Sequence, residues 1–144
     1  MASVNYSLTA GSEIEFLRAS AGTTGLSLTG NAFVNRLVSG VGDDALGDGA
    51  GNDSLGGGAG NDVFKFLAGF GQDTITDFAA GPAGSQDLID ISGLGITAAT
   101  FAANVHIANG GGGSTMVSFG GSANSIRLLN VAPANFDVTD CKLA

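Results

Sequence analysis

Aspartate returns at a fixed interval within a glycine-rich stretch near the middle of the chain. The sequence of residues 49–62 is GAGNDSLGGGAGND, in which Asp53 and Asp62 lie nine positions apart. A flexible linker has no need of a periodic carboxylate. Carboxylate oxygens are preferred ligands of hard divalent cations. The spacing therefore indicates cation chemistry that repeats along a regular structure.

The same nine-residue pattern covers three consecutive rows, at 39–47, 48–56 and 57–65. In each row the second and fourth residues are glycine, the sixth is aspartate and the eighth is large and apolar. A less regular row precedes them at 30–38, and another follows at 68–76 after an insertion. The residues at the sixth position of the five rows are Asn35, Asp44, Asp53, Asp62 and Asp73. The glycines at the second and fourth positions of the three regular rows are Gly40, Gly42, Gly49, Gly51, Gly58 and Gly60.

These rows resemble the RTX repeat, the hemolysin-type calcium-binding nonapeptide G-G-x-G-x-D-x-U-x, in which U is large and apolar. The resemblance implies an all-β fold, a parallel β-roll in which each row contributes a turn and a short strand. Two rows make one coil of that roll, so each row stacks on the next but one, about 4.8 Å away. This stacking pairs Asp44 with Asp62 and Asp53 with Asp73. Asn35 with Asp53 is a weaker pair, because an amide carries no charge.

Calcium is the cation that the resemblance implies. It takes roughly six to eight oxygen ligands, and it mixes carboxylates with backbone carbonyls. Aspartates on stacked turns supply the charge, while the glycine turns expose carbonyl oxygens. We therefore expect about two to four Ca²⁺ ions between the turns. The alternative is that the aspartates only cap the turns by accepting local N–H groups.

The segment after the rows, 73–92, resembles the one that closes RTX β-rolls in secreted metalloproteases and alginate epimerases. In that family carboxylates of the closing segment hold a further calcium ion, and Asp77 and Asp87 are the matching candidates. Hydrogen bonding within the loop is an equal alternative for both residues. We expect Asp90 to cap a turn.

The pattern favours one domain over residues 1–144. Short strands in 4–29 would cap the start of the roll, since a solenoid needs atypical terminal rows. The calcium-binding rows occupy 30–76. Residues 77–144 would form an antiparallel β cap that ends in a secretion signal. The terminal 137–144 are acidic and then apolar, which resembles the uncleaved C-terminal signal of type I export; a frayed terminus is the alternative.

Composition excludes several classes of function. The net charge is −8, with 13 acidic and 5 basic residues, which disfavours nucleic acid and anionic membranes. No apolar stretch is long enough for membrane insertion, and the N-terminus does not resemble a secretory signal peptide. Cys141 is the single cysteine, so no internal disulfide is expected. His106 is the single histidine, and without a partner it predicts neither a catalytic set nor an enzyme.

The sequence thus predicts a calcium-binding RTX module that folds on calcium binding outside a bacterial cell, either secreted or at the cell surface. Its expected partners are calcium ions, a type I exporter during secretion and an upstream catalytic or adhesive domain. Two alternatives stay open. One is a polysaccharide-binding accessory module, and the other is a fragment for calcium-dependent adhesion or surface-layer assembly.

Overall fold

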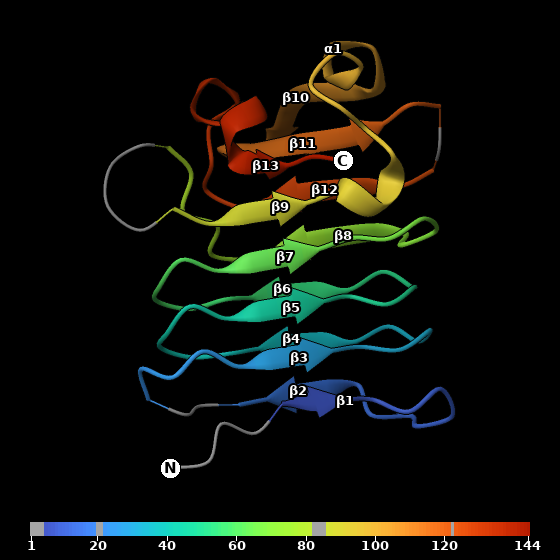
Figure 1. The fold of residues 1–144 in the computed structure, drawn as a ribbon, viewed down its shortest axis with the longest axis vertical. Helices are drawn as coiled ribbons and strands as arrows, with labels where there is room; N and C mark the ends of the chain where they lie inside the picture. Colours follow the sequence, from blue (N-terminus) through green and yellow to red (C-terminus); the bar gives the residue numbers. More distant parts are fainter. Residues whose placement is uncertain (1–4, 20–21, 82–85, 122) are drawn as a thin grey trace.

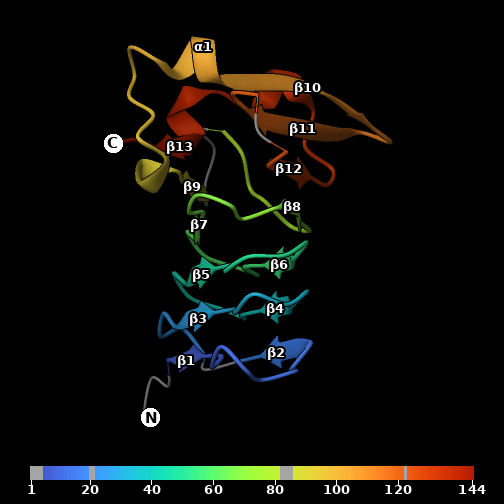
Figure 2. The same ribbon diagram turned by 90° about the vertical axis from the view of Figure 1, so that its right-hand side faces the viewer.

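Two β-sheets, parallel over most of their strands, face each other along the length of the molecule (Figure 1, Figure 2). The computed structural model describes residues 5–19, 22–81, 86–121 and 123–144. Val4, at the start of the expected N-terminal cap, and residues 82–85 of the closing segment lie outside the described residues. Successive strands alternate between the sheets through β9, so each turn crosses from one sheet to the other.

The first sheet contains, in spatial order, β1 (Tyr6–Ser7), β3 (Ser27–Thr29), β5 (Ala45–Gly47), β7 (Val63–Lys65), β9 (Leu88–Asp90) and β13 (Cys141–Lys142). The second contains β2 (Phe16–Arg18), β4 (Arg36–Val38), β6 (Ser54–Gly56), β8 (Gln72–Ile75), β12 (Ser125–Leu128), β11 (Ser114–Phe119) and β10 (Val105–Gly111). The helical segments are α1 (Phe101–Asn104) and the 3₁₀ turns η1 (Ser92–Leu94), η2 (Pro133–Asn135) and η3 (Val138–Asp140).

The strand register places each row on the row two positions along the chain. Leu46 of β5 pairs with Phe64 of β7, and on the facing sheet Leu37 of β4 pairs with Leu55 of β6. All four side chains are completely buried between the sheets. One row cannot bury its apolar eighth residue alone, whereas stacked rows form a continuous core. The predicted all-β parallel β-roll is therefore confirmed.

The C-terminal region closes one end of the roll (Figure 1). Strands β10, β11 and β12 pair in antiparallel fashion, as expected for the cap. However, β12 also pairs in parallel with β8, so the cap continues the second sheet instead of packing on it. The rings of Phe70 and Phe119 meet at 5.5 Å between centroids and join the roll core to the cap core. No helix among the described residues is long and apolar enough to cross a membrane.

The last residues do not fray, which was the alternative for 137–144, because they contribute a strand. Cys141 pairs with Ile89, so β13 extends the first sheet. Phe136, just before this segment, is buried and packs against Phe78, with ring centroids 5.9 Å apart. Asp140 is also buried, although Val138 is 39% exposed. The tail is thus part of the folded cap.

Candidate metal centre

The turns between the sheets place the predicted ligands along two edges of the roll. Asp44, Asp53, Asp62 and Asp87 each stand just before a strand, and Asp73 is the second residue of β8. The turns leading from the first sheet to the second carry Asn35, Asp53 and Asp73 on one edge. The turns leading back carry Asp44, Asp62 and Asp87 on the other edge, and Asp87 follows a longer segment. Below these are called the Asp53 edge and the Asp62 edge.

Hydrogen bonds link neighbouring turns along the Asp53 edge. The N–H of Asn35 donates to Oδ1 of Asp53 at 2.7 Å, and the N–H of Asp53 donates to Oδ1 of Asp73 at 2.7 Å. Asp53 and Asp73 therefore lie on adjacent turns, as the stacking of rows requires. Asn35 uses its own amide differently, since its Oδ1 accepts from the N–H of Asn31 and its Nδ2 donates to the carbonyl of Ile14.

The Asp62 edge repeats this arrangement. The N–H of Asp44 donates to Oδ1 of Asp62 at 2.9 Å, and the N–H of Asp62 donates to Oδ1 of Asp87 at 2.9 Å. Oδ1 of Asp44 accepts from the N–H of Leu26 at 2.7 Å. One oxygen of each carboxylate therefore caps a neighbouring turn, which is the alternative role that the sequence leaves open.

The second oxygens set some of these carboxylates apart. Oδ2 of Asp53, Asp62 and Asp73 is buried and accepts no hydrogen bond. The same is true of Oδ2 of Asp48, a residue outside the positions that the repeat pattern predicts as calcium ligands. Removing an ionised carboxylate from water without a partner is costly. Capping alone therefore leaves these four oxygens unexplained.

Burial changes the acidity of these groups. Loss of solvent raises the pKa of Asp53 and of Asp62 from 3.8 to about 6 in each case. Burial followed by repulsion from Asp73 raises the pKa of Asp48. Burial also raises the pKa of Asp73. Without a cation, the folded chain therefore disfavours the ionised form of these carboxylates.

Three carboxylates of the Asp53 edge form a compact cluster. Asp48, Asp53 and Asp73 each place a carboxylate oxygen within 4.8 Å of the other two. A Ca²⁺ ion about 2.3–2.6 Å from each ligand would bridge oxygens at such separations. The ion pair found among the described residues joins Lys142 to Asp90 at 3.0 Å, outside this cluster. No described cationic side chain forms an ion pair with these carboxylates, so the donor set fits a bound calcium ion.

The other predicted acidic ligands have both oxygens engaged. Asp77 accepts from the N–H groups of Gly57 and Gly58, each at 3.0 Å. Asp87 accepts from the N–H of Ala79 at 2.8 Å in addition to its bond with Asp62. The structure therefore brings these two residues to the Asp62 edge as caps of backbone turns. A ligand role for either residue stays a prediction.

Asp44 and Asp90 also have defined partners. Asp44 accepts from the N–H of Gly40 at 3.3 Å through its second oxygen. Asp90, expected to cap a turn, accepts from the N–H and hydroxyl of Ser92 at 3.1 and 2.6 Å. Of the aspartates predicted as ligands, Asp53, Asp62 and Asp73 are thus the ones that keep a buried free oxygen.

The repeat glycines allow the turns to approach one another closely. Gly58 has φ +92°, and a Cβ there would collide with the carbonyl oxygen of Gly40 on the neighbouring turn. Gly60 has the same relation to the carbonyl oxygen of Gly42. Gly49 and Gly51 face the Asn31 and Phe33 carbonyls in the same way. This is why glycine is required, whereas coordination by their carbonyls stays a prediction.

Comparison with solved structures gives the same architecture. The AlgE6R2 subunit of the Azotobacter vinelandii mannuronan C5-epimerase is 25% identical over 92% of this chain and 93% of that one, with a TM-score of 0.61. The AlgE6R3 subunit of the same enzyme is 22% identical over 94% of this chain and 83% of that one, with a TM-score of 0.56. No protein-family model and no curated protein matches the chain. The chain therefore shares its fold with these two subunits of an epimerase.

Proposed function

We propose that this chain is a calcium-binding module of a larger secreted bacterial protein, and that it folds when calcium fills the spaces between stacked turns. The observation that carries the proposal is the set of buried carboxylate oxygens without a partner on stacked turns. Carboxylates in such a position need a cation for compensation. Glycine turns and aspartates at a nine-residue period match a site for a hard cation with oxygen ligands.

The mechanism follows from where the cation is available. Without calcium, the stacked carboxylates repel one another and the glycine turns lose much conformational entropy on folding. With calcium, the binding free energy becomes folding free energy, because the assembled site exists only in the folded chain. Extracellular modules bind calcium at about 10⁻⁴–10⁻³ M. A chain tuned to this range stays unfolded in the cytosol and folds outside.

This mechanism suits a type I exporter, which would thread the unfolded chain. An upstream catalytic or adhesive domain would then acquire a stable, folded neighbour after export. The structural likeness to subunits of a mannuronan C5-epimerase supports a modular role, since those subunits are parts of a larger enzyme. We assign no catalytic step to the chain.

Calorimetric titration of the chelator-treated chain tests the proposal. Calcium is expected to bind with a stoichiometry of about two to four ions and with affinity in the submillimolar to millimolar range. Magnesium is the control, and it should bind poorly because it demands near-octahedral geometry at shorter distances. Absence of calcium binding, or equal binding of the two ions, would contradict the proposal.

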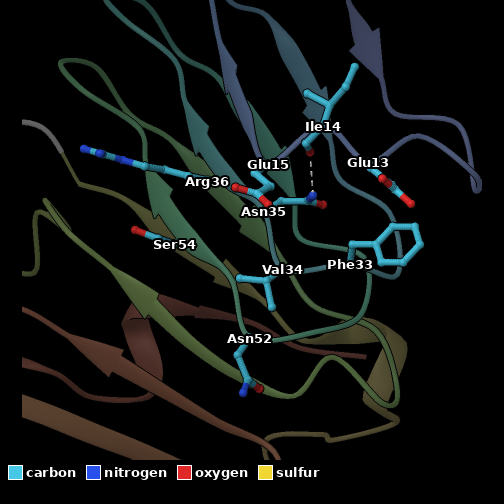
Figure 3. Close-up of a pocket in the computed structure, with 9 residues that line it drawn as sticks. All are labelled: Glu13, Ile14, Glu15, Phe33, Val34, Asn35, Arg36, Asn52 and Ser54. Atoms are coloured by element: carbon cyan, nitrogen blue, oxygen red, sulfur yellow. Dashed lines mark hydrogen bonds between the residues drawn. The ribbon is translucent and has the colours of Figure 1, made fainter.

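Polysaccharide binding is a second candidate, and an open groove favours it. The groove has a volume of about 640 Å³ and lies beside the turn that precedes β4. Phe33, Val34 and Ile14 provide its apolar surface, while Glu13 and Arg36 provide polar groups (Figure 3). Phe33, Val34 and Ile14 are 46%, 61% and 47% exposed, so they form one apolar patch on the surface. Such a surface suits the apolar faces of sugar rings.

Titration with oligosaccharides in saturating calcium tests this second candidate. We expect a neutral oligosaccharide to bind more tightly than a mannuronan oligomer, because the chain carries a net charge of −8. Phe33→Ala should weaken the binding about tenfold or more, the scale of a central aromatic contact. Leu67→Ala, also exposed but outside the groove, is the control. If neither class of glycan binds, the groove has no such role.

A further inference from the structure

We propose that Asp48 is an additional calcium ligand, which makes the Asp53 edge the tighter of the two edges and the first to fill. This inference rests on the proposed calcium function and extends it. Asp48 occupies the first position of its nine-residue row, where the repeat pattern has glycine and where the neighbouring rows have Ser39 and Gly57. The nonapeptide pattern therefore does not assign it a ligand role.

The other nine-residue rows show what lies beside a side chain at the first position. A Cβ on Gly57 would collide with Oδ2 of Asp62, the sixth residue of the same row. A Cβ on Gly30 would lie 2.7 Å from Oδ1 of Asn35, again the sixth residue of its row. A Cβ at the first position of these two rows therefore lies beside the sixth side chain, whereas Ser39, in a row between them, donates its hydroxyl to the carbonyl of Gly57 at 2.6 Å. At Asp48 the side chain is itself a carboxylate, and it lies near the carboxylates of both Asp53 and Asp73.

Burial shows that the Asp48 side chain is directed inward, where one of its carboxylate oxygens lacks a partner. Only 1% of its surface is exposed, and its Oδ2 accepts no hydrogen bond. Asp53 and Asp73 also keep buried, unpartnered Oδ2 atoms, and oxygens of the three residues lie within 4.8 Å of one another. A buried polar group normally has a hydrogen-bonding partner. Three orphaned oxygens in one place therefore define a site that a cation completes.

The two edges differ because of this one residue. On the Asp62 edge the first position is Gly57, which leaves no room for a third carboxylate. Asp44 and Asp87 are the neighbours of Asp62 on this edge. In each of them both carboxylate oxygens accept hydrogen bonds from backbone N–H groups. The affinity of oxygen sites for calcium rises with the number of charged ligands. The Asp53 edge, with three free carboxylate oxygens, should therefore bind calcium first.

Asp48→Asn isolates the charge of this residue while preserving its size. In mildly alkaline buffer the variant should lose about tenfold or more in affinity at the tightest class of calcium sites, since ligand charge sets affinity. The weaker class should be unchanged. In chelator the same variant should keep at least as much β-sheet circular dichroism signal as the wild type, because one repelling carboxylate is gone. Asp48→Gly, which installs the residue of the next row, should lose affinity in the same way.

Asp43→Asn is the matched control, because it removes the same unit of charge from an exposed position. Oδ1 of Asp43 accepts from the N–H of Asn61 at 2.9 Å. The side-chain oxygen of Asn52 performs the same task for Gln72 at 3.0 Å, so asparagine is an adequate replacement. This variant should retain the wild-type affinity. An equal loss in Asp43→Asn would mean that net charge alone is responsible, which would overturn the inference.

The outcomes separate this inference from the proposed function. Calcium binding by the wild type with unchanged tight affinity in Asp48→Asn would overturn the inference alone. A variant that is less stable in calcium and also has less residual β-sheet signal than the wild type in chelator would overturn it too, because a merely structural role for Asp48 gives that result. Absence of calcium binding by the wild type would overturn the proposed function, and the inference with it.

Discussion

In a calcium-chelating buffer near neutral pH, the chain is expected to lose most of its β-sheet circular dichroism signal, and millimolar calcium should restore it. The reason is the energetic cost of the buried carboxylates. Raising the pKa of Asp53 and of Asp62 from 3.8 to about 6 corresponds to roughly 3 kcal/mol of lost stability for each ionised group. The combined cost of two such groups is comparable with the net stability of a typical domain, which is about 5–15 kcal/mol.

The pH dependence of the calcium-free chain has a definite sign. The folded-state pKa of Asp53 and Asp62 lies above the unfolded value, so the folded chain binds protons more tightly than the unfolded chain. Their contribution to stability is therefore fully present below about pH 4 and is lost as the pH rises through about 6. The raised pKa of Asp48 and Asp73 acts in the same direction. Partial order should thus return in chelator as the pH is lowered toward about 5.

Thermal melts with chelator and with calcium, each across this pH range, measure both effects. In calcium the melting temperature should instead fall at acid pH, because protons compete with the metal for the same oxygens. A chain whose spectrum and melting temperature are the same in chelator and in calcium at every pH would contradict the folding mechanism.

Deleting residues 137–144 is expected to destabilise the calcium-bound chain by about 3–5 kcal/mol, on the basis of the hydrogen bonds that disappear. The carbonyl of Lys142 accepts from the N–H of Ile91 at 3.0 Å, and the N–H of Ala144 donates to the carbonyl of Ile96 at 3.0 Å. The buried carboxylate of Asp140 accepts from the N–H of Gly81 at 3.2 Å. Urea denaturation in saturating calcium measures the change.

Lys142→Ala is the control for this deletion. It removes the ion pair with Asp90, in which the lysine side chain is 60% exposed, and it leaves the backbone of β13 in place. The side chain of Asp90 is only 6% exposed, but it keeps its hydrogen bonds to Ser92, so the loss should be about 1 kcal/mol and well below that of the deletion. Equal midpoints for the truncated and full chains would mean that β13 contributes nothing. Since the tail is part of the folded cap, loss of folding must not be mistaken for loss of export. A test of the tail as an export signal must therefore measure how much chain the cells release, counting unfolded chain as well.

The period of the repeat made the roll and its stacked aspartates predictable. Nine residues per row and two rows per coil fix which turns are adjacent, so Asp53 and Asp73 could be paired from the sequence alone. The repeat pattern does not predict Asp48, because the first position of the nonapeptide is glycine and belongs to the turn. The available signal was an acidic residue at a place where the other rows have Ser39, Gly57 or Gly30.

Features outside the repeat were harder to predict. Strand β13 contains only two residues, which is too short for a periodic pattern, and it forms because β9 offers it a free edge. The two N–H groups that donate to the carboxylate of Asp77 come from a turn 19 or 20 residues earlier in the chain. The role of Asp77 therefore depends on tertiary geometry. Local sequence carries no information about either contact.

The hydrogen bonds between neighbouring turns also determine how the roll would respond to a mechanical load. These bonds join turns 18 to 25 residues apart, as between Asp44 and Asp62 or between Asp62 and Asp87, so every coil is held only by its neighbours. At one end β1 and β2 have a single partner strand each, whereas the opposite end is closed by the cap. Tension applied along the stack acts on every coil, and the outermost coil is the one that only a single neighbour holds. The roll would lengthen in small successive steps from the β1–β2 end, each one releasing about a coil of chain, in contrast to the single abrupt rupture of a sheet whose strands are sheared together.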